Sequence, residues 1–230
     1  MYLVPNVIAA GTTPVIPQSV RDTLTTINYF LAEDIRTARR YLSSLKIYDH
    51  IESLQFEVLN KDTDTASLKE LLKPLIDGNN VGVISESGCP GIADPGSLAV
   101  SFAHQNNIQV VPLVGPSSIL LALMASGLNG QRFAFHGYLP IDSNEASKMI
   151  KELERESLQK NQTQLFIETP YRNNHVLDHL LKTLNPETQL SIAIDLTGSK
   201  ERVQTKLVSS WKLNKPTLPK EPAIFSFLAG

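Results

Sequence analysis

The sequence predicts an α/β fold with two α/β domains, a mostly parallel N-terminal sheet and a mixed C-terminal sheet. Short apolar runs alternate with helical patterns along the chain, which is typical of strands joined by helices in a parallel sheet. The length of 230 residues suits one large domain or two small ones. A polar segment, 140–145, separates two groups of expected strands. We therefore expect an N-terminal domain 1–140 and a C-terminal domain 141–230.

The expected strands are the short apolar runs Tyr2–Val4, Tyr29–Ala32, Val81–Ser85, Gln109–Leu113, Phe133–Gly137, Gln164–Glu168, Leu190–Leu196 and Ala223–Leu228. The expected helices are Ser67–Ile76, Ile119–Ala125, Ala146–Leu158 and Asn174–Leu184. In the last of these, apolar residues from Val176 to Leu184 recur at helical spacing and form one apolar face. Gly78 follows the first helix and is a usual signal for a helix C-terminus.

Composition excludes several classes of protein. Hydrophobic residues make up 42% and charged residues 19%, which favours a packed core over disorder. The net charge of −2 is too low for a protein that grips nucleic acid mainly through bulk charge. The single cysteine, Cys89, forms no intramolecular disulfide, which favours the cytoplasm. The N-terminus has no signal-peptide pattern, and no apolar run is long enough to span a membrane.

The loop Ser85–Gly96 has the sequence features of a ligand-binding loop. It follows an apolar strand and precedes a helix, and ligands of open α/β sheets bind at the carboxyl ends of strands. Its three glycines and two prolines let the backbone approach a ligand and hold a shape. Glu86 and Asp94 suit hydroxyls, an amine or a cation. A tight turn without a ligand is the alternative. Neither a dinucleotide-binding nor a P-loop glycine pattern is present.

A second loop, Val114–Ser118, has the same placement after the strand Gln109–Leu113 and before the helix Ile119–Ala125. Ser117 and Ser118 can cap that helix or bind a ligand through hydroxyls and backbone amides. The two interpretations are compatible.

These loops, in this order, resemble the tetrapyrrole methylase family of S-adenosylmethionine-dependent methyltransferases. The resemblance is strongest to the branch that methylates a cytidine 2′-hydroxyl in small-subunit ribosomal RNA. The family pattern D-A-G-T-P-x-x-x-D-P-G corresponds to Glu86–Gly96, and P-G-P-S-A corresponds to Val114–Ser118. The patterns A-E-D-T-R, A-L-x-x-S-G-L through G-F-L-P, and E-[ST]-P-x-R correspond to Ala32–Arg36, Ala122–Pro140 and Glu168–Arg172.

Several positions depart from the family pattern. The first loop, P-T-P-I-G-N-L in the branch, is Pro5–Gly11 here, and its glycine and asparagine are displaced or lost. Glu86 replaces the usual aspartate and Cys89 the usual threonine. The E-L-T-K motif is Asp195–Gly198 and lacks its lysine. The chain also ends before the C-terminal segment that is common in the branch. Because the cofactor loops match better than the substrate loops, cofactor use is the firmer expectation.

The resemblance implies S-adenosylmethionine as the cofactor, in a cleft between the two domains that the C-terminal domain completes. The cofactor residues that it implies are Pro5, Ser85, Glu86, Ser87, Gly88, Pro90, Ile92, Asp94, Pro95, Gly115, Pro116, Ser117, Ser118, Tyr138, Leu139, Glu168, Thr169, Pro170, Leu196 and Thr197. It further implies a homodimer, an RNA substrate in the small ribosomal subunit, and no membrane partner.

Methyl transfer to a hydroxyl requires a base to remove its proton. Among the acids and histidines near the strand ends we select Glu86 and Asp34 as catalytic candidates. The interpretation that we favour over this is that both only orient the cofactor or cap helices. Thr169 and Pro170 also fit a helix cap and its first turn, besides facing the cofactor.

The substrate candidates are basic. Arg36, Arg39 and Arg40 recur at helical spacing, so one helix face is basic and suits RNA phosphates. A solvated face is the alternative. We add Arg172 from the E-[ST]-P-x-R motif.

We expect no metal site. His175 and His179 have the spacing of the histidines in H-E-x-x-H zinc sites, but position 176 is valine and no third ligand is evident. The leading function is therefore 2′-O-methylation of a cytidine in ribosomal RNA. Methylation of a tetrapyrrole or another small molecule, and a cofactor-binding protein without catalysis, are the alternatives.

Overall fold

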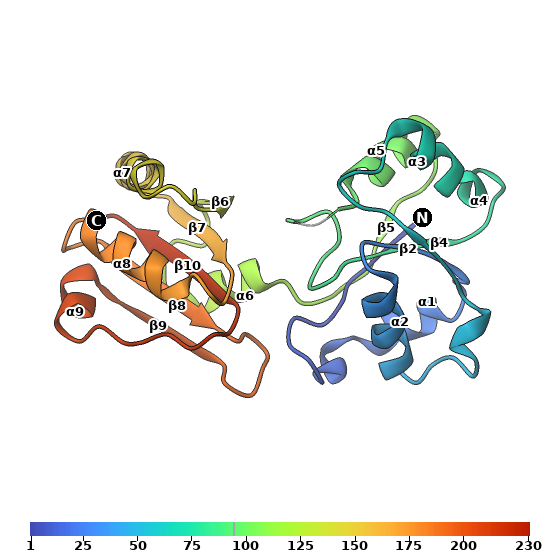
Figure 1. The fold of residues 1–230 in the computed structure, drawn as a ribbon, viewed down its shortest axis with the longest axis horizontal. Helices are drawn as coiled ribbons and strands as arrows, with labels where there is room; N and C mark the ends of the chain where they lie inside the picture. The colour runs from blue at the N-terminus through green and yellow to red at the C-terminus, as the bar shows by residue number, and fades with distance from the viewer. Residues whose placement is uncertain (94) are drawn as a thin grey trace. The chain divides into compact units, whose positions relative to one another are not determined.

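Two separate five-stranded sheets organise the chain in the computed structural model, which describes residues 1–93 and 95–230 (Figure 1). One sheet belongs to a unit formed by Met1–Ser117 and the other to a unit formed by Ser118–Gly230. The first sheet is parallel and the second is mixed, so the predicted α/β class is confirmed.

The N-terminal sheet has the strand order β3-β2-β4-β1-β5, and its pairs are all parallel. Its strands are β1 (Tyr2–Val4), β2 (Tyr29–Ala32), β3 (Gln55–Val58), β4 (Val81–Ile84) and β5 (Val111–Pro112). Its helices are η1 (Thr13–Val15), α1 (Gln18–Leu24), α2 (Ile35–Ser44), η2 (Ile51–Ser53), α3 (Thr65–Leu71), α4 (Lys73–Ile76) and α5 (Ser97–Gln105). Because β4, β1 and β5 are neighbours, the loops that follow them leave the same edge of the sheet side by side.

Helices cover both faces of this sheet, as Figure 1 shows. Phe30 packs in a core with α1 and α2, whereas the next residue, Leu31, packs in a second core with α3, α4 and α5. Alternate residues of a strand point to opposite faces, so one buried strand serves two cores. Both side chains have no exposed surface.

The C-terminal sheet has the order β6-β7-β10-β8-β9, with β6 and β7 parallel and the other pairs antiparallel. Its strands are β6 (Phe133–Tyr138), β7 (Thr163–Glu168), β8 (Gln189–Ile194), β9 (Arg202–Leu207) and β10 (Ala223–Leu228). Its helices are α6 (Ser118–Ser126), α7 (Ser143–Lys160), α8 (Asn173–Thr183) and α9 (Val208–Leu213).

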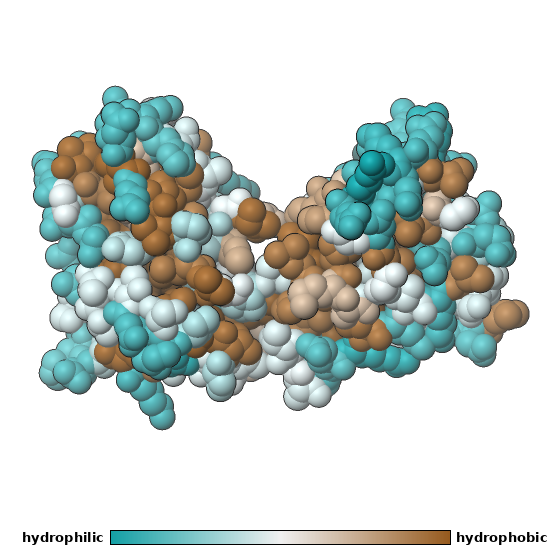
Figure 2. All heavy atoms as spheres, turned by 180° about the vertical axis from the view of Figure 1, so that it is seen from behind, coloured by the Kyte–Doolittle hydropathy of each residue, from teal (hydrophilic) through white to brown (hydrophobic). Residues whose placement is uncertain are grey.

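The two faces of the C-terminal sheet are covered by different helices. Phe225 packs with α7, α8 and α9, whereas its neighbour Ile224 packs with α6. Phe166 stacks on Phe225 with ring centroids 5.8 Å apart at the centre of the larger core. The outer face of α7 is hydrophilic and forms the teal cluster at the upper right of Figure 2.

The division between the units lies earlier than the sequence suggested. We expected the boundary after Pro140, but the structure divides the chain between Ser117 and Ser118. The reason is pairing: β6 hydrogen-bonds to β7, and α6 packs on β8, β9 and β10. The polar segment 140–145 is thus a connection inside the second unit, where Asp142 caps α7.

The predicted strands are all present, three with the predicted bounds and the others with shifted ends, but β3 and β9 were missed. Both are edge strands, and polar residues alternate with apolar ones in each. Such strands carry little hydrophobic signal because edges are kept polar. The predicted helix Ser67–Ile76 is divided into α3 and α4 at Leu72, since Pro74 cannot donate a backbone hydrogen bond inside a continuous helix.

Candidate functional site

The loops after β1 and β4 are joined by one buried side chain, that of Asn6. Its Nδ2 donates to the carbonyl oxygens of Ser85 and Glu86, at 3.0 Å each. Its backbone N–H donates to the carbonyl of Gly88 at 2.8 Å, and its Oδ1 accepts from the N–H of Val7. Asn6 is 3% exposed, so these bonds are protected from water. The predicted loop 85–96 is thereby fixed to the end of the neighbouring strand.

The loops after β1 and β5 are in direct contact. A Cβ atom at Gly115 would collide with the Cβ and Cγ atoms of Pro5, so only glycine fits there. The Cys89 thiol contacts the carbonyl of Pro116 at 3.5 Å. Three predicted cofactor segments, around Pro5, Gly88 and Gly115, therefore come together at the carboxyl edge of the N-terminal sheet.

An internal hydrogen bond and three glycines fix the shape of the loop after β4. The Ser85 hydroxyl is buried and donates to the carbonyl of Gly88 at 2.6 Å, closing a tight turn. Gly88, Gly91 and Gly96 have φ angles of 72°, 78° and 140°, a region that favours glycine. Glu86, Ser87 and Ile92 are exposed, Pro90 is buried and Pro95 half-buried. Asp94, also predicted to bind the cofactor, lies outside the described residues.

Three carboxylates gather where β2 and β4 end. Partial desolvation of its carboxyl group, and then the charges of Glu33 and Asp34, raise the pKa of Glu86 above its ordinary value. Asp34 differs, because it is the N-cap of α2 and accepts a 2.7 Å hydrogen bond from the N–H of Thr37. That bond lowers the pKa of Asp34. The structure thus gives Asp34 the helix-capping role that we favoured, and the pKa values of the two acids shift in opposite directions.

A hollow of ≈ 380 Å³ lies beside these acids, within the N-terminal unit. Its lining comes from the ends of β2, β3 and β4: Glu33, Leu59, Asn60, Lys61, Ala93, Pro95, Gly96, Ser97 and Leu98. A larger hollow of ≈ 680 Å³ lies near the amino ends of β2, β3 and β4, and includes Asn28, Gln55 and Asn80. Because the loops that carry chemistry leave the carboxyl ends, the smaller hollow is the one that fits a site.

The predicted basic face is present on α2, where Arg36, Arg39 and Arg40 are all exposed. The guanidinium of Arg39 lies over the ring of Phe56, 5.1 Å from its centroid. This contact covers an aromatic side chain of the edge strand β3, so Arg39 has a packing role whatever else it binds.

In the C-terminal unit, the segment after β7 is held by internal contacts. Glu168 is 2% exposed, and its Oε1 accepts a 2.7 Å hydrogen bond from the N–H of Thr169. Its Oε2 lies 3.4 Å from Nη1 of Arg172, whose Nη2 donates to the carbonyl of Pro140. The expectation that Thr169 caps α8 is wrong, because α8 begins at Asn173 with Arg172 as its N-cap. Thr169 instead starts a turn, with Pro170 half-buried within it.

The loop after β8 has an unusual backbone. Asp195 and Thr197 have φ angles of 49° and 67°, which are uncommon for residues with a side chain. The Thr197 hydroxyl is buried without a hydrogen-bond partner among the residues that the structure describes. Strained backbone and unpaired buried hydroxyls both occur at functional sites. The ligand contact expected at Leu196 and Thr197 stays a prediction, and Thr197 is the residue of this loop with an unpaired buried hydroxyl.

Other predicted cofactor residues either pack in the cores or lie at the ends of elements. Leu139 and Leu196 are buried in the two cores of the C-terminal unit, so their side chains are engaged in packing. Tyr138 is 53% exposed at the end of β6. Ser117 is the last residue of the first unit and Ser118 the first residue of α6.

Metal chemistry finds no support in the described residues. They contain no group of three or more His, Cys, Asp or Glu side chains that could hold a metal ion. The rings of His175 and His179 lie 4.5 Å apart on α8 without such a third partner. Burial raises the pKa of the Cys89 thiol, which disfavours the reactive thiolate. Within residues 1–93 and 95–230, no helix has the length and apolar character needed to span a membrane.

Comparison with known proteins adds independent evidence. The family model of tetrapyrrole (corrin/porphyrin) methylases matches residues 11–210, which is most of the chain. The chain belongs to this family. The tetrapyrrole methylases are methyltransferases, so the chain is an enzyme of that class.

Two curated relatives carry the name ribosomal RNA small subunit methyltransferase I. The one from Vibrio cholerae serotype O1 is 30% identical over 89% of this chain and 67% of its own length. The one from Synechocystis sp. is 31% identical over 81% of this chain and 63% of its own length. The chain thus spans about two thirds of the length of these relatives.

Two solved methyltransferases have the same fold. The crystal structure of the methyltransferase CobJ gives a TM-score of 0.60 at 14% identity and covers 94% of both chains. That of uroporphyrin-III-C-methyltransferase from Thermus thermophilus gives 0.55 at 17% identity, covering 99% of this chain and 90% of its own. At these identities the likeness concerns the fold.

Sequence reasoning missed two residues that hold this methylase's loops. Asn6 was noted only as a departure from the family's first loop, yet it anchors the loop after β4. Tyr41, on α2, is buried and donates a 2.7 Å hydrogen bond to the carbonyl of Pro5. Burial raises the pKa of Tyr41, which keeps the phenol protonated as a donor. Their partners are distant in sequence, so no local pattern marks either residue.

Proposed function

We propose that the chain transfers a methyl group from S-adenosylmethionine to the 2′-hydroxyl of a cytidine in small-subunit ribosomal RNA. The observation that carries the proposal is the acidic edge of the N-terminal sheet, where Glu33, Asp34 and Glu86 gather beside the fixed loops after β1, β4 and β5. The names of the curated relatives support the RNA acceptor.

The residues present fit this cofactor. When bound, S-adenosylmethionine supplies a methyl group activated on a sulfonium. Its sulfonium and ammonium groups are cationic, and a cation beside Glu86 offsets the repulsion that Glu33 and Asp34 impose. The contact of Gly115 with Pro5 and the positive φ angles of the β4 loop fix the backbone at this edge. Pro5, Gly88, Gly115 and Pro116 are the residues that we expect to hold the cofactor.

The acceptor hydroxyl loses its proton as its oxygen gains the methyl group. A carboxylate within reach of the hydroxyl can accept this proton. Of the two candidates, Glu86 is the one available for that role, because the Asp34 carboxylate caps α2. The chain's own part is to hold the hydroxyl in line and to take its proton on Glu86. Arg36 and Arg40 are placed to contact RNA phosphates.

Calorimetry with S-adenosylmethionine and S-adenosylhomocysteine tests the cofactor site. The two differ in the positive charge on sulfur, so Glu86→Gln should weaken binding of the sulfonium compound more than binding of the thioether. The matched control is Glu70→Gln on the exposed surface of α3. Absence of binding by the unaltered chain at millimolar cofactor would refute the proposal.

Methyl transfer from labelled cofactor to isolated small ribosomal subunits tests the acceptor, and mapping of the modified nucleotide identifies the cytidine. Transfer to a tetrapyrrole but not to subunits would instead assign a small-molecule substrate. Cofactor binding without any transfer would assign a non-catalytic role. The homodimer and the cytoplasmic location stay predictions, and light scattering tests the first.

A further inference from the structure

An exposed aromatic ring in the C-terminal unit is paired with a lysine from a distant segment. Tyr171 is 84% exposed, in the turn between β7 and α8. Nζ of Lys220 lies 5.6 Å from the centroid of its ring. Lys220 precedes β10 by only a few residues and is itself exposed. A lysine can cover one ring face only, so a tyrosine this exposed offers its other face to a ligand.

Two asparagines hold the segment that carries Lys220, residues 214–222, which we name the lysine loop. Asn173 has no exposed surface, and its Nδ2 donates to the carbonyls of Pro219 and Glu221 at 3.2 and 2.7 Å. Asn174 bonds Leu218 in both directions, donating to its carbonyl and accepting from its N–H. Asn173 and Asn174 begin α8, directly after Tyr171 and Arg172. The backbone that carries Lys220 is therefore tied to the helix terminus that directly follows Tyr171.

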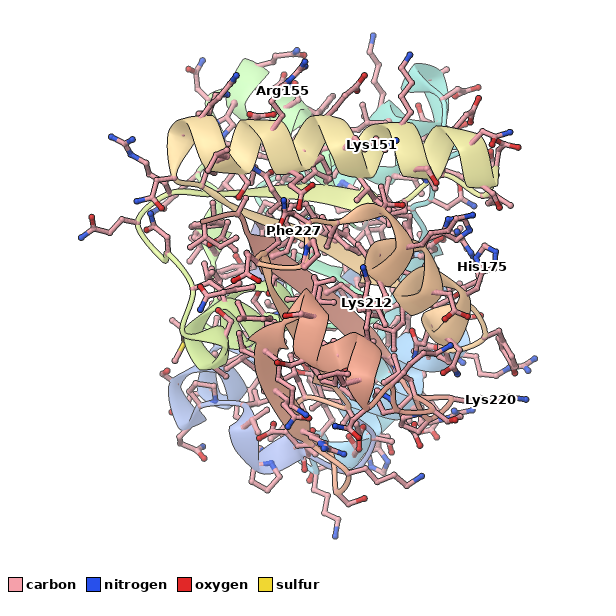
Figure 3. All side chains as sticks on the ribbon, turned by 90° about the vertical axis from the view of Figure 1, so that its left-hand side faces the viewer. Lys151, Arg155, His175, Lys212, Lys220 and Phe227 are labelled. Atoms are coloured by element: carbon pink, nitrogen blue, oxygen red, sulfur yellow. The ribbon has the colours of Figure 1, made fainter. Side chains whose placement is uncertain are left out.

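The segment of the chain that leads to Lys220 is basic. Residues 200–220 include the cations Lys200, Arg202, Lys206, Lys212, Lys215 and Lys220, but only one acid, Glu201. The nearby acids are already engaged, since Glu221 pairs with Lys200, Asp178 with Lys215 and Glu168 with Arg172. Neither Lys212 nor Lys220 forms an ion pair with any described residue. Figure 3 shows Lys212, Lys220 and His175 on the same side of this unit.

We propose that Tyr171 and Lys220 form a contact for single-stranded RNA. An unpaired base stacks on the free face of Tyr171, while Lys220 contacts a backbone phosphate. Exposed aromatic rings interleaved with cations are the usual platform for single strands, because every base has a face that can stack. This inference rests on the proposed RNA substrate and places a part of its binding outside Arg36 and Arg40.

The contact is preorganised by the asparagines rather than by the hydrophobic core. Tyr171 and Lys220 contribute little buried surface, so their substitution leaves the fold intact. A backbone segment that is already held loses less conformational entropy on binding, which strengthens binding. The variants below therefore test recognition separately from stability.

The test is fluorescence anisotropy with a labelled single-stranded RNA of about 15 nucleotides, beside a duplex of equal length. Tyr171→Leu should weaken single-strand binding by about 5- to 100-fold, the loss of one stacked base. Tyr171→Phe should retain binding because its ring still stacks. Duplex binding should be unchanged in both, since paired bases cannot stack on a side chain.

The lysine is tested by salt dependence. Lys220→Gln should reduce the slope of log affinity against log salt by about 0.7, the share of one phosphate contact on a single strand. Lys69→Gln, on the exposed face of α3, is the matched control and should leave the slope unchanged. A structural role for Lys220 would change affinity without changing the slope.

The outcomes separate this inference from the proposed function. Unchanged single-strand binding by Tyr171→Leu, or an equal loss for single strand and duplex, overturns the RNA contact while methyl transfer to subunits stands. If the unaltered chain binds S-adenosylmethionine but neither binds nor methylates RNA, the proposed acceptor and the contact both fail. Cofactor affinity should be equal in all four variants, and a change there would contradict a role limited to RNA.

Discussion

Asn6 and Asn173 use the same device in the two units. Each is buried, and each donates both Nδ2 hydrogens to carbonyls of a loop far away in sequence. They differ in their oxygens: Oδ1 of Asn6 accepts from the N–H of Val7, whereas Oδ1 of Asn173 has no partner within the described part of the chain. Asn6 holds the loop after β4, which lies beside the acids, and Asn173 holds the lysine loop.

The two units also differ in charge. Residues 1–117 include twelve acidic and eight basic residues, and residues 118–230 include eleven acidic and thirteen basic ones. This difference agrees with the proposals of a cationic cofactor at the acidic edge of the first unit and of an RNA contact in the second, in addition to Arg36 and Arg40. The low net charge of the whole chain conceals this asymmetry.

The largest expected effect is on the free energy of unfolding, and it tests whether the hydrophobic cores of the two units unfold independently. Phe166→Ala should cost about 3–5 kcal/mol of the C-terminal unit's free energy of unfolding, because a fully buried ring leaves a cavity. Phe30→Ala should do the same in the N-terminal unit. Trp211 is the only tryptophan and is buried in the C-terminal core, so its fluorescence reports that unit. Urea unfolding should shift this signal for Phe166→Ala and not for Phe30→Ala; equal shifts would contradict independent cores.

The next effect concerns the close approach of the loops after β1 and β5. Gly115→Ala forces its new methyl group against Pro5 and should cost about 1–3 kcal/mol, as overpacking does. It should also weaken the binding of S-adenosylmethionine by tenfold or more, which is about 1.4 kcal/mol of binding free energy. Calorimetry measures this loss. Gly130→Ala has open space around its Cβ and serves as the control, with no loss of affinity. Tight cofactor binding by Gly115→Ala would show that the contact has no role in the site.

Replacing the two asparagines tests the comparison directly. Each substitution by alanine should cost about 1–3 kcal/mol, since buried carbonyls lose their donors. Asn6→Ala should cost more than Asn173→Ala, because it also leaves the N–H of Val7 unpaired, whereas Asn173→Ala removes an unpaired oxygen. Asn6→Ala should impair cofactor affinity alone, and Asn173→Ala should impair single-strand RNA affinity alone. The reverse pattern would refute the assignment of ligands to units.

The smallest effect is a pH dependence of opposite sign at two acids. The pKa of Glu86 is raised in the folded chain, so its contribution to stability declines as pH rises from the ordinary glutamate value through the raised one. The pKa of Asp34 is lowered, so its contribution is present above the ordinary aspartate value and is lost as pH falls through the lowered one. Relative to the unaltered chain, Glu86→Gln should therefore raise Tm at neutral pH, and Asp34→Ala should lower it. Both differences should shrink toward acid pH in thermal scans; differences of the same sign would contradict the assignment.

Much of the fold was predictable because buried strands leave a strong local signal. The strands Tyr2–Val4, Tyr29–Ala32 and Ala223–Leu228 were predicted with the bounds that they have. The edge strands β3 and β9 were missed, because their polar residues face solvent and hide the pattern. The domain boundary was misplaced, because it depends on which sheet β6 joins, a pairing that no single segment encodes.

Part of the candidate site was likewise predictable from the sequence, and part was not. The glycine loop after β4, the glycine at 115 and the acids Glu86 and Asp34 were evident in sequence, since their chemistry lies in residue type and order. The cap at Asp34 was also the favoured interpretation, whereas the bonds of Arg172 to Glu168 and Pro140 were not predicted. The same holds for Thr169, where a cap was expected and a turn is found.

The sequence by itself determined the α/β class, the family and the loops that carry chemistry, because these depend on periodicity and on residues close together in the chain. Only the tertiary structure decided which loops meet, that Asn6 and Asn173 hold them, and that Lys220 lies over Tyr171. Asn6 and Glu86 are 80 residues apart and Asn173 and Glu221 are 48 apart. Contacts of that separation are set by strand order and packing, which local sequence does not record.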